Sequence, residues 1–528
     1  MSTGAGRTRR IVTGAAAVSM ATILLSRLSG LVRDVVIAAV FGQGRHTDTY
    51  YAALQIPDLL FFLIAGGALS SSFMPVYIEY RAQQGEDEAW RLFSVVATLW
   101  TTFVLVLVAL GELLAPWLVP VLAAPGFPPA ELAQVVVLTR IALPAQIAFF
   151  TGGLLMGVQW AHGGFLVPGL GPTVYNLGIM AGGALGGLTL GPRAGVAGLV
   201  WGALGGALVG NLLLQIYGLW RYQPRFRPTF DLRHPGARRV LWLMLPVIFS
   251  LSLPNVDVQV NRWFASHLFP GAMSALERAN RLMLVPVGLF GQAVSVGFYA
   301  SLSQLAVARQ FDEFRATVVY GLRLLACLAL PATAFLVVCG EPTVALLFQH
   351  GRFSAEDTRL VAGALAVYSL GIWCWCSEQL CARAFYALQD TRTPVWTGTG
   401  VTVVFVGLNY ALWKLFERLW GPSAAHLGLA CSTTLSALLY VVLLLVLLRR
   451  RVGGLHLVQL GATAAKALVA ALALGLVGWA VRRAGLSPLA TVALAGGLGL
   501  TVFGAVALAL GLEEVRAATA LVRQKLGR

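Results

Sequence analysis

The sequence predicts an all-α polytopic membrane protein, on the evidence of its composition, its long apolar stretches and the placement of its charges. Of 528 residues, 58% are hydrophobic and only 11% are charged, whereas about a quarter of the residues in a soluble domain are charged. So few charges cannot cover a water-soluble surface of this size. The bilayer is therefore expected to be the solvent for most of the chain, which argues against a soluble, many-domain protein.

Long apolar stretches define the expected spans. A helix that crosses the bilayer needs about 20 mostly apolar residues, and reading the loops by charge, proline and glycine gives about fourteen transmembrane helices. They cover residues 16–40, 50–79, 93–121, 132–158, 164–188, 194–220, 240–266, 278–304, 317–340, 359–387, 394–416, 424–448, 461–482 and 487–512. The first stretch continues through Arg27 and Arg33 without a small-residue cleavage site, so it is expected to remain as a span and not to be a signal peptide.

The basic residues predict the orientation. The formal net charge is +16, and arginines gather at the N-terminus, in the loop 221–239, at 449–451 and in the tail. These segments lie on one side of the membrane if the spans are as drawn, and the positive-inside rule makes that side cytoplasmic. Both termini are therefore predicted to be cytoplasmic. The excess charge is assigned to an anionic leaflet and not to nucleic acid.

An internal repeat predicts two lobes. The segment Gly67–Phe93 resembles Gly291–Val318, and both run from small residues through a phenylalanine to an acidic turn that ends in arginine. The copies lie six spans apart with the same topology. The expected arrangement is an N-lobe at 16–220, a C-lobe at 240–448 and two additional C-terminal spans at 461–512. Six helices in each lobe would surround a central cavity, and rocking of the lobes would give alternating access.

Charged residues inside the first span are the first candidate site. Arg27, Arg33 and Asp34 lie within it, and insertion scales assign roughly 2.5–3.5 kcal/mol to each such residue at a helix centre. The helix is therefore expected to line a watery cavity or to pair with its neighbours. Snorkelling near a helix end is the alternative for Arg33 and Asp34.

Arg281 in the eighth span is the second candidate. Glu277 precedes it by four residues, which favours a local helical ion pair and a structural role. The alternative is that Arg281 joins Arg27 in a cationic cavity between the lobes. Guanidinium groups bind phosphate oxygens bidentately, so such a cavity would suit a pyrophosphate.

The seventh span carries a third candidate, a polar stretch with Asp257 and Asn261 on one helical face. With Asn409 of the eleventh span, these residues are a candidate cation site, although hydrogen bonding between helices explains them equally well. The six cysteines show no metal-ligand spacing, and no metal is expected. No phosphate-binding GxxxxGK[ST] motif occurs, so ATP hydrolysis is not expected and the chain is interpreted as a transporter and not an enzyme.

Four segments resemble the MurJ/MviN family of lipid II flippases, within the multidrug/oligosaccharidyl-lipid/polysaccharide exporter superfamily. They are SRLSGLVRDVVIAAVFG, IPDLLFFLIAGGALSSSFMPV, the ANRL around Arg281 and ARAFYALQDTRTPV. The resemblance implies fourteen spans, two lobes and a cationic cavity in the bacterial cytoplasmic membrane. It also implies an undecaprenyl-pyrophosphate-linked peptidoglycan precursor as substrate, without a cofactor, driven by membrane potential or a monovalent cation. Cell-wall synthesis enzymes are candidate partners.

By position, Arg27, Arg33 and Arg281 resemble the family's substrate-binding arginines, with Asp34 and Glu277 as gating or charge partners. The sequence departs from the family in span two, where Phe61 and Gly66 occupy an arginine and a glutamate position. This departure keeps open a flippase for another polyprenyl-linked saccharide, such as an O-antigen or capsule unit. A multidrug cation antiporter would require acidic cavity residues, and a non-transporting scaffold would leave the arginines unexplained.

Overall fold

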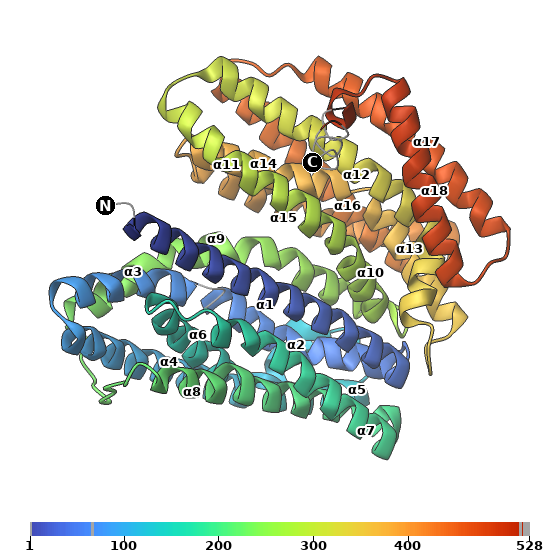
Figure 1. Cartoon of the computed structure of the whole chain (residues 1–528). Helices are drawn as coiled ribbons and strands as arrows, with labels where there is room; N and C mark the ends of the chain where they lie inside the picture. Colours follow the sequence, from blue (N-terminus) through green and yellow to red (C-terminus); the bar gives the residue numbers. More distant parts are fainter. Residues whose placement is uncertain (1–2, 65–67, 517–519, 521–528) are drawn as a thin grey trace. The chain divides into compact units, whose positions relative to one another are not determined.

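The computed structural model describes residues 3–64, 68–516 and 520, and it describes the side chains of those residues apart from 3–16, 63–71 and 245–255. Within these ranges the chain is helical and contains no strand. It divides into two compact units, Met1–Gly271 and Ala272–Arg528 (Figure 1). Each unit is described by itself below.

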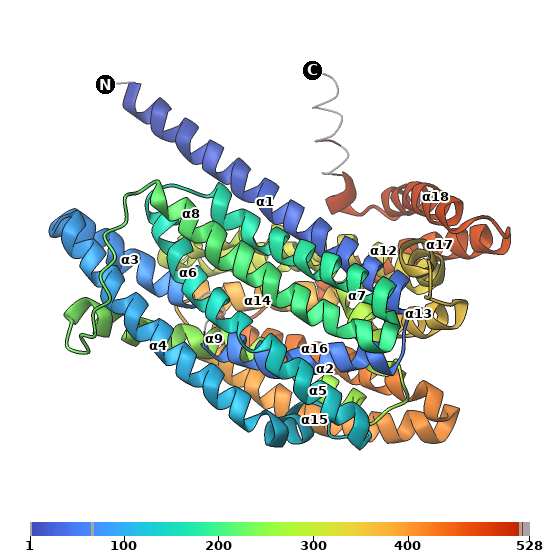
Figure 2. The ribbon, with the colours of Figure 1, turned by 90° about the horizontal axis from the view of Figure 1, so that it is seen from below.

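Among its described residues, the first unit contains nine α-helices, and π-turns follow α4 and α7. Its elements are α1 (Thr3–Phe41), α2 (Arg45–Ile64), α3 (Ala68–Gln83), α4 (Glu86–Leu118), η1 (Val119–Ala123), α5 (Pro129–Ala142), α6 (Ala145–Ala161), α7 (Leu166–Ala207), η2 (Leu208–Leu213), α8 (Leu214–Trp220) and α9 (Pro235–Ala265). Helix α1 packs along α7, and Figure 2 shows the two running side by side. His234 starts α9 by accepting a hydrogen bond from the Ala237 N–H, and burial lowers the pKa of this histidine.

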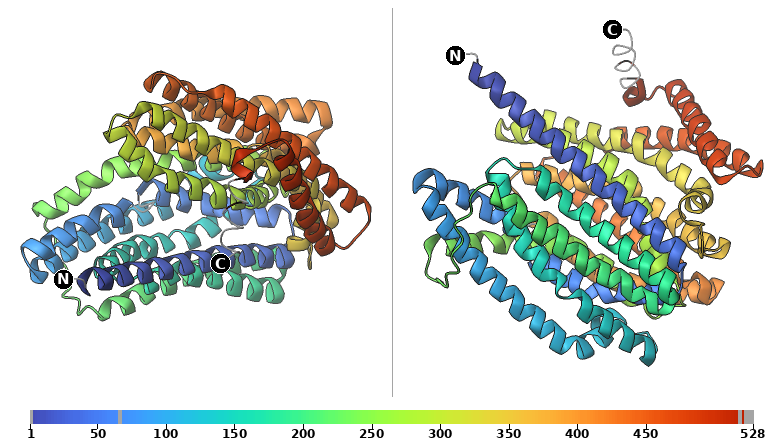
Figure 3. Two further views of the ribbon diagram at one scale, coloured as in Figure 1. Left: turned by 45° about the horizontal axis from the view of Figure 1, so that its top comes forward. Right: turned by 60° about the horizontal axis from the view of Figure 1, so that its bottom comes forward.

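The second unit also contains nine α-helices. Its elements are α10 (Ala272–Pro286), η3 (Val287–Gly291), α11 (Gln292–Val307), α12 (Phe311–Phe348), α13 (Ala355–Ser369), α14 (Ile372–Ala387), α15 (Arg392–Trp420), η4 (Pro422–Ala424), α16 (Ala425–Arg451), α17 (Leu457–Arg483) and α18 (Pro488–Ala509). The last two helices form a hairpin that packs on α12, as Figure 3 shows. The core of this contact includes Ala467, Ala471, Leu474 and Phe503.

The expected fold class is confirmed, and the number of spans stays a prediction. Among the described residues, nine helices are long and apolar enough to cross a membrane, or ten if the bent pair α13–α14 forms one span. One of the nine is the continuous stretch Leu166–Trp220, which covers two expected spans. Helices α1, α2 and α9 are not among them, and each carries charged residues within its length.

The two units do not divide the chain where the expected lobes do. The sequence places the boundary in the loop 221–239, but the compact units divide after Gly271. Helix α9 packs against α2 and α3 of the first unit, whereas the expected C-lobe begins with this helix. The candidate residues Asp257 and Asn261 therefore belong to the first unit, and the two-lobe grouping stays a prediction.

The two copies of the repeat form equivalent local structures. Each is a helix–turn–helix, α3–α4 in the first unit and α11–α12 in the second. The turns contain a left-handed residue in each case, Gly85 and Arg309. Each turn also contacts a loop of its own unit: Asp87 pairs with Arg225, and Arg315 donates to the Gly453 carbonyl at 3.2 Å.

The glycine-dense stretch folds into two closely packed helical halves. Gly191 has a left-handed φ of 73° and breaks α7 between the expected spans 164–188 and 194–220. Gly178 and Gly182 then face Gly202 and Gly198 so closely that a β-carbon on Gly182 would lie 2.3 Å from the Gly198 carbonyl oxygen. Small residues at four-residue intervals permit such backbone contact between membrane helices.

This contact predicts a position-dependent effect of added methyl groups. Gly182→Ala is expected to destabilise the protein by about 1–3 kcal/mol, because the clash is with backbone and not with a flexible side chain. Gly205→Ala is the matched control, since a β-carbon there meets nothing within 4 Å and alanine stabilises a helix by up to about 1 kcal/mol over glycine. Melting temperatures of the two purified variants test this, and equal destabilisation by both would contradict the close-packing interpretation.

Candidate functional site: charged residues within the helices

Arg33 and Asp34 form a buried network with α7. Arg33 donates from Nε and NH2 to Asp34 Oδ1 at 3.0 and 2.9 Å, and from NH1 to Asn176 Oδ1 at 2.9 Å. The Asn176 amide donates in turn to Ser29 Oγ at 2.9 Å. The side chains of Arg33 and Asp34 are only 14% and 6% exposed. Arg33 is thus compensated by neighbours within its unit, and its role in substrate binding stays a prediction.

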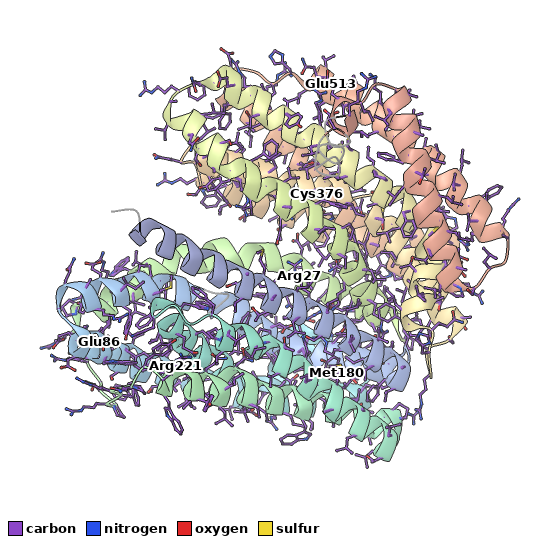
Figure 4. All side chains as sticks on the ribbon, viewed as in Figure 1. Arg27, Glu86, Met180, Arg221, Cys376 and Glu513 are labelled. Carbon is purple, nitrogen blue, oxygen red and sulfur yellow. The ribbon has the colours of Figure 1, made fainter. Side chains whose placement is uncertain are left out.

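Arg27 lies in a different setting on the same helix. It is exposed, two turns before Arg33, and Figure 4 labels it on α1. The neighbouring Leu24, Leu25 and Leu28 are also exposed. A permanently charged guanidinium on an apolar helix face requires water, a phosphate or another charge nearby. Of the two arginines of the first span, Arg27 is therefore the more exposed, and its role in substrate binding stays a prediction.

An ion pair between α2 and α9 was not identified as a site from the sequence. Arg262 NH1 lies 2.9 Å from Asp58 Oδ2, and the two side chains are 8% and 36% exposed. Gln55 strengthens the contact by donating to the Gln259 carbonyl at 3.1 Å and to the Leu122 carbonyl at 2.9 Å. The sequence does contain a signal for this ion pair, because an acidic residue in one span and an arginine in another are candidates to pair within the membrane.

Phe61, at the position where the family pattern has arginine, packs among aromatic rings. Its ring centroid lies 5.8 Å from that of Phe62, 5.7 Å from that of Phe149 and 6.4 Å from that of Phe150. Edge-to-face geometry at these distances is favourable for aromatic pairs. The arginine position thus contributes to an apolar contact between α2 and α6. Gly66, at the glutamate position, lies outside the described residues.

Arg281 and Glu277 form the local ion pair that their spacing predicts. Arg281 NH2 and Nε lie 3.2 and 3.3 Å from Glu277 Oε1, and the two side chains are 32% and 10% exposed. Glu277 is therefore mostly buried while the arginine is partly accessible.

Arg278 lies between Glu277 and Arg281 in the sequence of α10, and it is almost completely buried. It is 1% exposed, and its guanidinium carbon lies 5.4 Å from the centroid of Phe353, beyond α12. A cation over an aromatic face is stabilised by the ring quadrupole. Its burial makes Arg278 a structural residue of the second unit, which the sequence pattern did not distinguish from Arg281.

The candidate cation site is divided between the units. Asp257 and Asn261 are half-buried on α9 of the first unit, while Asn409 is fully buried on α15 of the second. Asn409 accepts a hydrogen bond from Ser432 of α16, which is the helix-packing function that the sequence left as an alternative. The described residues contain no group of three or more histidine, cysteine, aspartate or glutamate side chains that could hold a metal ion.

Comparison with known proteins shows which family this chain matches. The family described as lipid II flippase MurJ matches residues 37–494. The lipid II flippase MurJ of Burkholderia cenocepacia is 33% identical over 438 residues, covering 81% of this chain and 82% of the relative. A probable lipid II flippase MurJ of Vibrio cholerae is 30% identical over 437 residues, covering 80% of each chain.

Solved structures agree on the fold. A lipid II flippase MurJ in an inward closed conformation has a TM-score of 0.73 at 21% identity, covering 97% of this chain and 99% of that one. An inward-facing multidrug resistance MATE transporter of the MOP superfamily has a TM-score of 0.63 at 12% identity, covering 83% of this chain and 98% of that one. At these identities the structural likeness concerns the fold alone.

Proposed function

The chain belongs to the lipid II flippase MurJ family, and from this premise we propose that it translocates lipid II from the inner to the outer leaflet of the bacterial cytoplasmic membrane. The observation that carries the proposal is the family match over residues 37–494. In the proposed mechanism, both termini face the cytoplasm and the two lobes alternate in exposing a central cavity. Membrane potential or a monovalent cation would drive the cycle.

The proposed chemistry of binding rests on two arginines. Arg27 is exposed on α1, and Arg281 is partly accessible beside Glu277. Each guanidinium can donate two parallel hydrogen bonds to phosphate oxygens and keeps its charge throughout the cycle. We propose that these two groups bind the pyrophosphate of the substrate, while Arg33 and Asp34 hold α1 against α7. Asp257, Asn261 and Asn409 remain the proposed residues for a coupling cation.

A second candidate function is translocation of another polyprenyl-linked oligosaccharide. The observation that favours it is Phe61, whose aromatic contacts replace a positive charge in span two. The substrate would then differ from lipid II in its saccharide and would share the pyrophosphate. A multidrug cation antiporter is less well supported, because the accessible candidates on α1 and α10 are arginines.

Complementation tests the proposal directly. We expect the chain to restore growth and normal shape to a bacterium depleted of its own lipid II flippase, because the family's substrate is the peptidoglycan precursor. Membrane expression is verified in parallel by fluorescence of a C-terminal fusion. Absence of growth despite good membrane expression would reject lipid II as the substrate, and rescue of an O-antigen flippase mutant instead would establish the second candidate.

A further inference from the structure

A cavity of about 530 Å³ lies within the first unit, apart from the charged residues described above. It is bounded by α4, α6 and α8 and by the chain that follows α8. Its volume falls within the range of about 300–1,000 Å³ that is typical of ligand pockets. The cavity is only partly enclosed, and the part of α4 that lines it belongs to a candidate membrane span.

The wall of the cavity suits a hydrocarbon chain. Leucine, isoleucine and aromatic side chains line most of it, among them Leu154, Leu155 and Ile216. Three threonine hydroxyls in the wall form hydrogen bonds within the protein: Thr98 donates to the Ser94 carbonyl at 2.7 Å, and Thr101 and Thr151 pair at 3.3 Å. These three threonines therefore present their methyl groups to a molecule bound in the cavity.

The chain after α8 covers one side of the cavity as an extended strap, residues 221–230. Pro224, Phe226 and Pro228 of this strap line the cavity. Its backbone is fixed to α4, because the N–H groups of Arg227 and Thr229 donate to Ser94 and Thr98 at 3.1 and 3.2 Å. In an extended chain successive side chains point to opposite sides, so the residues between these three lie on the outer side of the strap.

The residues on the outer side, Arg225 and Arg227, are basic, and Arg221 lies in the turn that precedes the extended part of the strap. All three arginines are exposed, and Arg225 pairs with Asp87. Figure 4 labels Arg221 at the same end of the first unit as Glu86, the first residue of α4. Trp220, 67% exposed, lies beside them at the cavity mouth. Tryptophan at the rim of an apolar surface together with arginines is typical of the membrane–water interface.

From this combination we propose that the cavity binds an anionic glycerophospholipid of the surrounding bilayer. One acyl chain occupies the space between α4, α6 and α8, and the phosphate lies against Arg221 and Arg227 at the rim. Charge complementarity selects an anionic headgroup, while the apolar wall selects a molecule with a tail. The bound lipid fills a cavity that would otherwise remain between the strap and the helices, and it thereby stabilises the first unit.

Lipid addition to the purified full-length protein tests the proposal. After delipidation in detergent, phosphatidylglycerol and phosphatidylcholine with the same acyl chains are added, and bound lipid is counted by native mass spectrometry. The wild type is expected to retain phosphatidylglycerol roughly ten-fold more strongly, because both lipids carry a phosphate but only phosphatidylglycerol has a net negative headgroup for the two arginines to attract. Inorganic phosphate, which lacks a tail, is expected to have no effect on the melting temperature.

Two variants address the two parts of the site. Arg221→Ala with Arg227→Ala is expected to remove the preference for phosphatidylglycerol while some binding of both lipids remains. Ile216→Trp fills part of the cavity from a half-buried position and is expected to abolish binding of both. Arg449→Ala with Arg450→Ala, in an exposed basic segment of the second unit, is the charge-matched control and should bind as the wild type does.

Three outcomes would overturn the proposal. Equal retention of the two lipids by the wild type would show that the site has no preference for an anionic headgroup. Full binding by Ile216→Trp would show that the lipid binds outside the cavity. Displacement of the bound phosphatidylglycerol by an undecaprenyl-pyrophosphate compound, with one molecule replacing another, would show that the cavity belongs to the substrate pathway.

Discussion

Arg27→Ala is expected to abolish complementation while the protein remains folded in the membrane. Arg27 is exposed on α1, and substitution of an exposed residue usually changes stability by less than about 0.5 kcal/mol. Hydrogen bonds to charged groups contribute about 1.5–3 kcal/mol each, so losing one bidentate contact to a pyrophosphate weakens binding by roughly 10- to 100-fold or more. The expected loss therefore falls on transport and not on folding.

The measurements for Arg27 are growth of the depleted strain, membrane expression and the melting temperature of the purified variant. Arg27→Lys retains the charge but cannot form the planar bidentate contact, so it should restore part of the activity. Arg450→Ala, an exposed arginine of the second unit, controls for general loss of positive charge. Full activity of Arg27→Ala together with Arg281→Ala would contradict the proposed pyrophosphate-binding mechanism.

Arg33 makes a useful contrast because it lies on the same helix. Its guanidinium is committed to Asp34 and Asn176, so its loss would remove helix packing as well as charge. From the sequence, the cost of burying a charge is the same for both arginines, and only position in the span distinguishes them, through the snorkelling alternative for Arg33. Asn176 lies 143 positions from Arg33, and no local pattern connects them.

The fold class could be predicted from composition, because a chain with so few charged residues must expose many hydrophobic side chains. Those side chains require lipid around them. Local signals were equally readable, as the Glu277–Arg281 pair shows, because four residues of helix bring two side chains onto one face. What composition and spacing could not give was the assignment of α9 to the first unit. That depends on long-range contacts such as those of Gln55 with Gln259, which the span order alone does not determine.

The same limit applies to the aromatic environment of Phe61. The sequence shows that an arginine is missing from span two, but the rings of Phe149 and Phe150 that surround Phe61 come from α6. At this position, aromatic contacts between α2 and α6 therefore replace the charged arginine of the family pattern. Whether an apolar side chain in that place is tolerated depends on its neighbours, and these become visible only in the folded chain.

Breaking the Asp58–Arg262 pair is expected to have the largest effect on stability, and the effect should be unequal between its partners. Arg262 is 8% exposed while Asp58 is 36% exposed. Removing one partner of a buried ion pair costs about 3–5 kcal/mol because the other charge is left uncompensated. Asp58→Asn leaves a buried guanidinium that cannot lose its proton, so it should approach the lower end of that range.

Arg262→Gln should cost less, on the order of 1 kcal/mol, because a partly exposed carboxylate left behind can be hydrated or can take up a proton. The double variant Asp58→Asn with Arg262→Gln should be more stable than Asp58→Asn alone, since an uncharged pair of similar volume carries no uncompensated charge. Melting temperatures of the four proteins form a double-mutant cycle that isolates the coupling. A larger loss of stability in Arg262→Gln than in Asp58→Asn would show that Arg262 contributes packing against α2 beyond its charge. Simple addition of the two single effects in the double variant would show that the ion pair is not what holds α9 to α2.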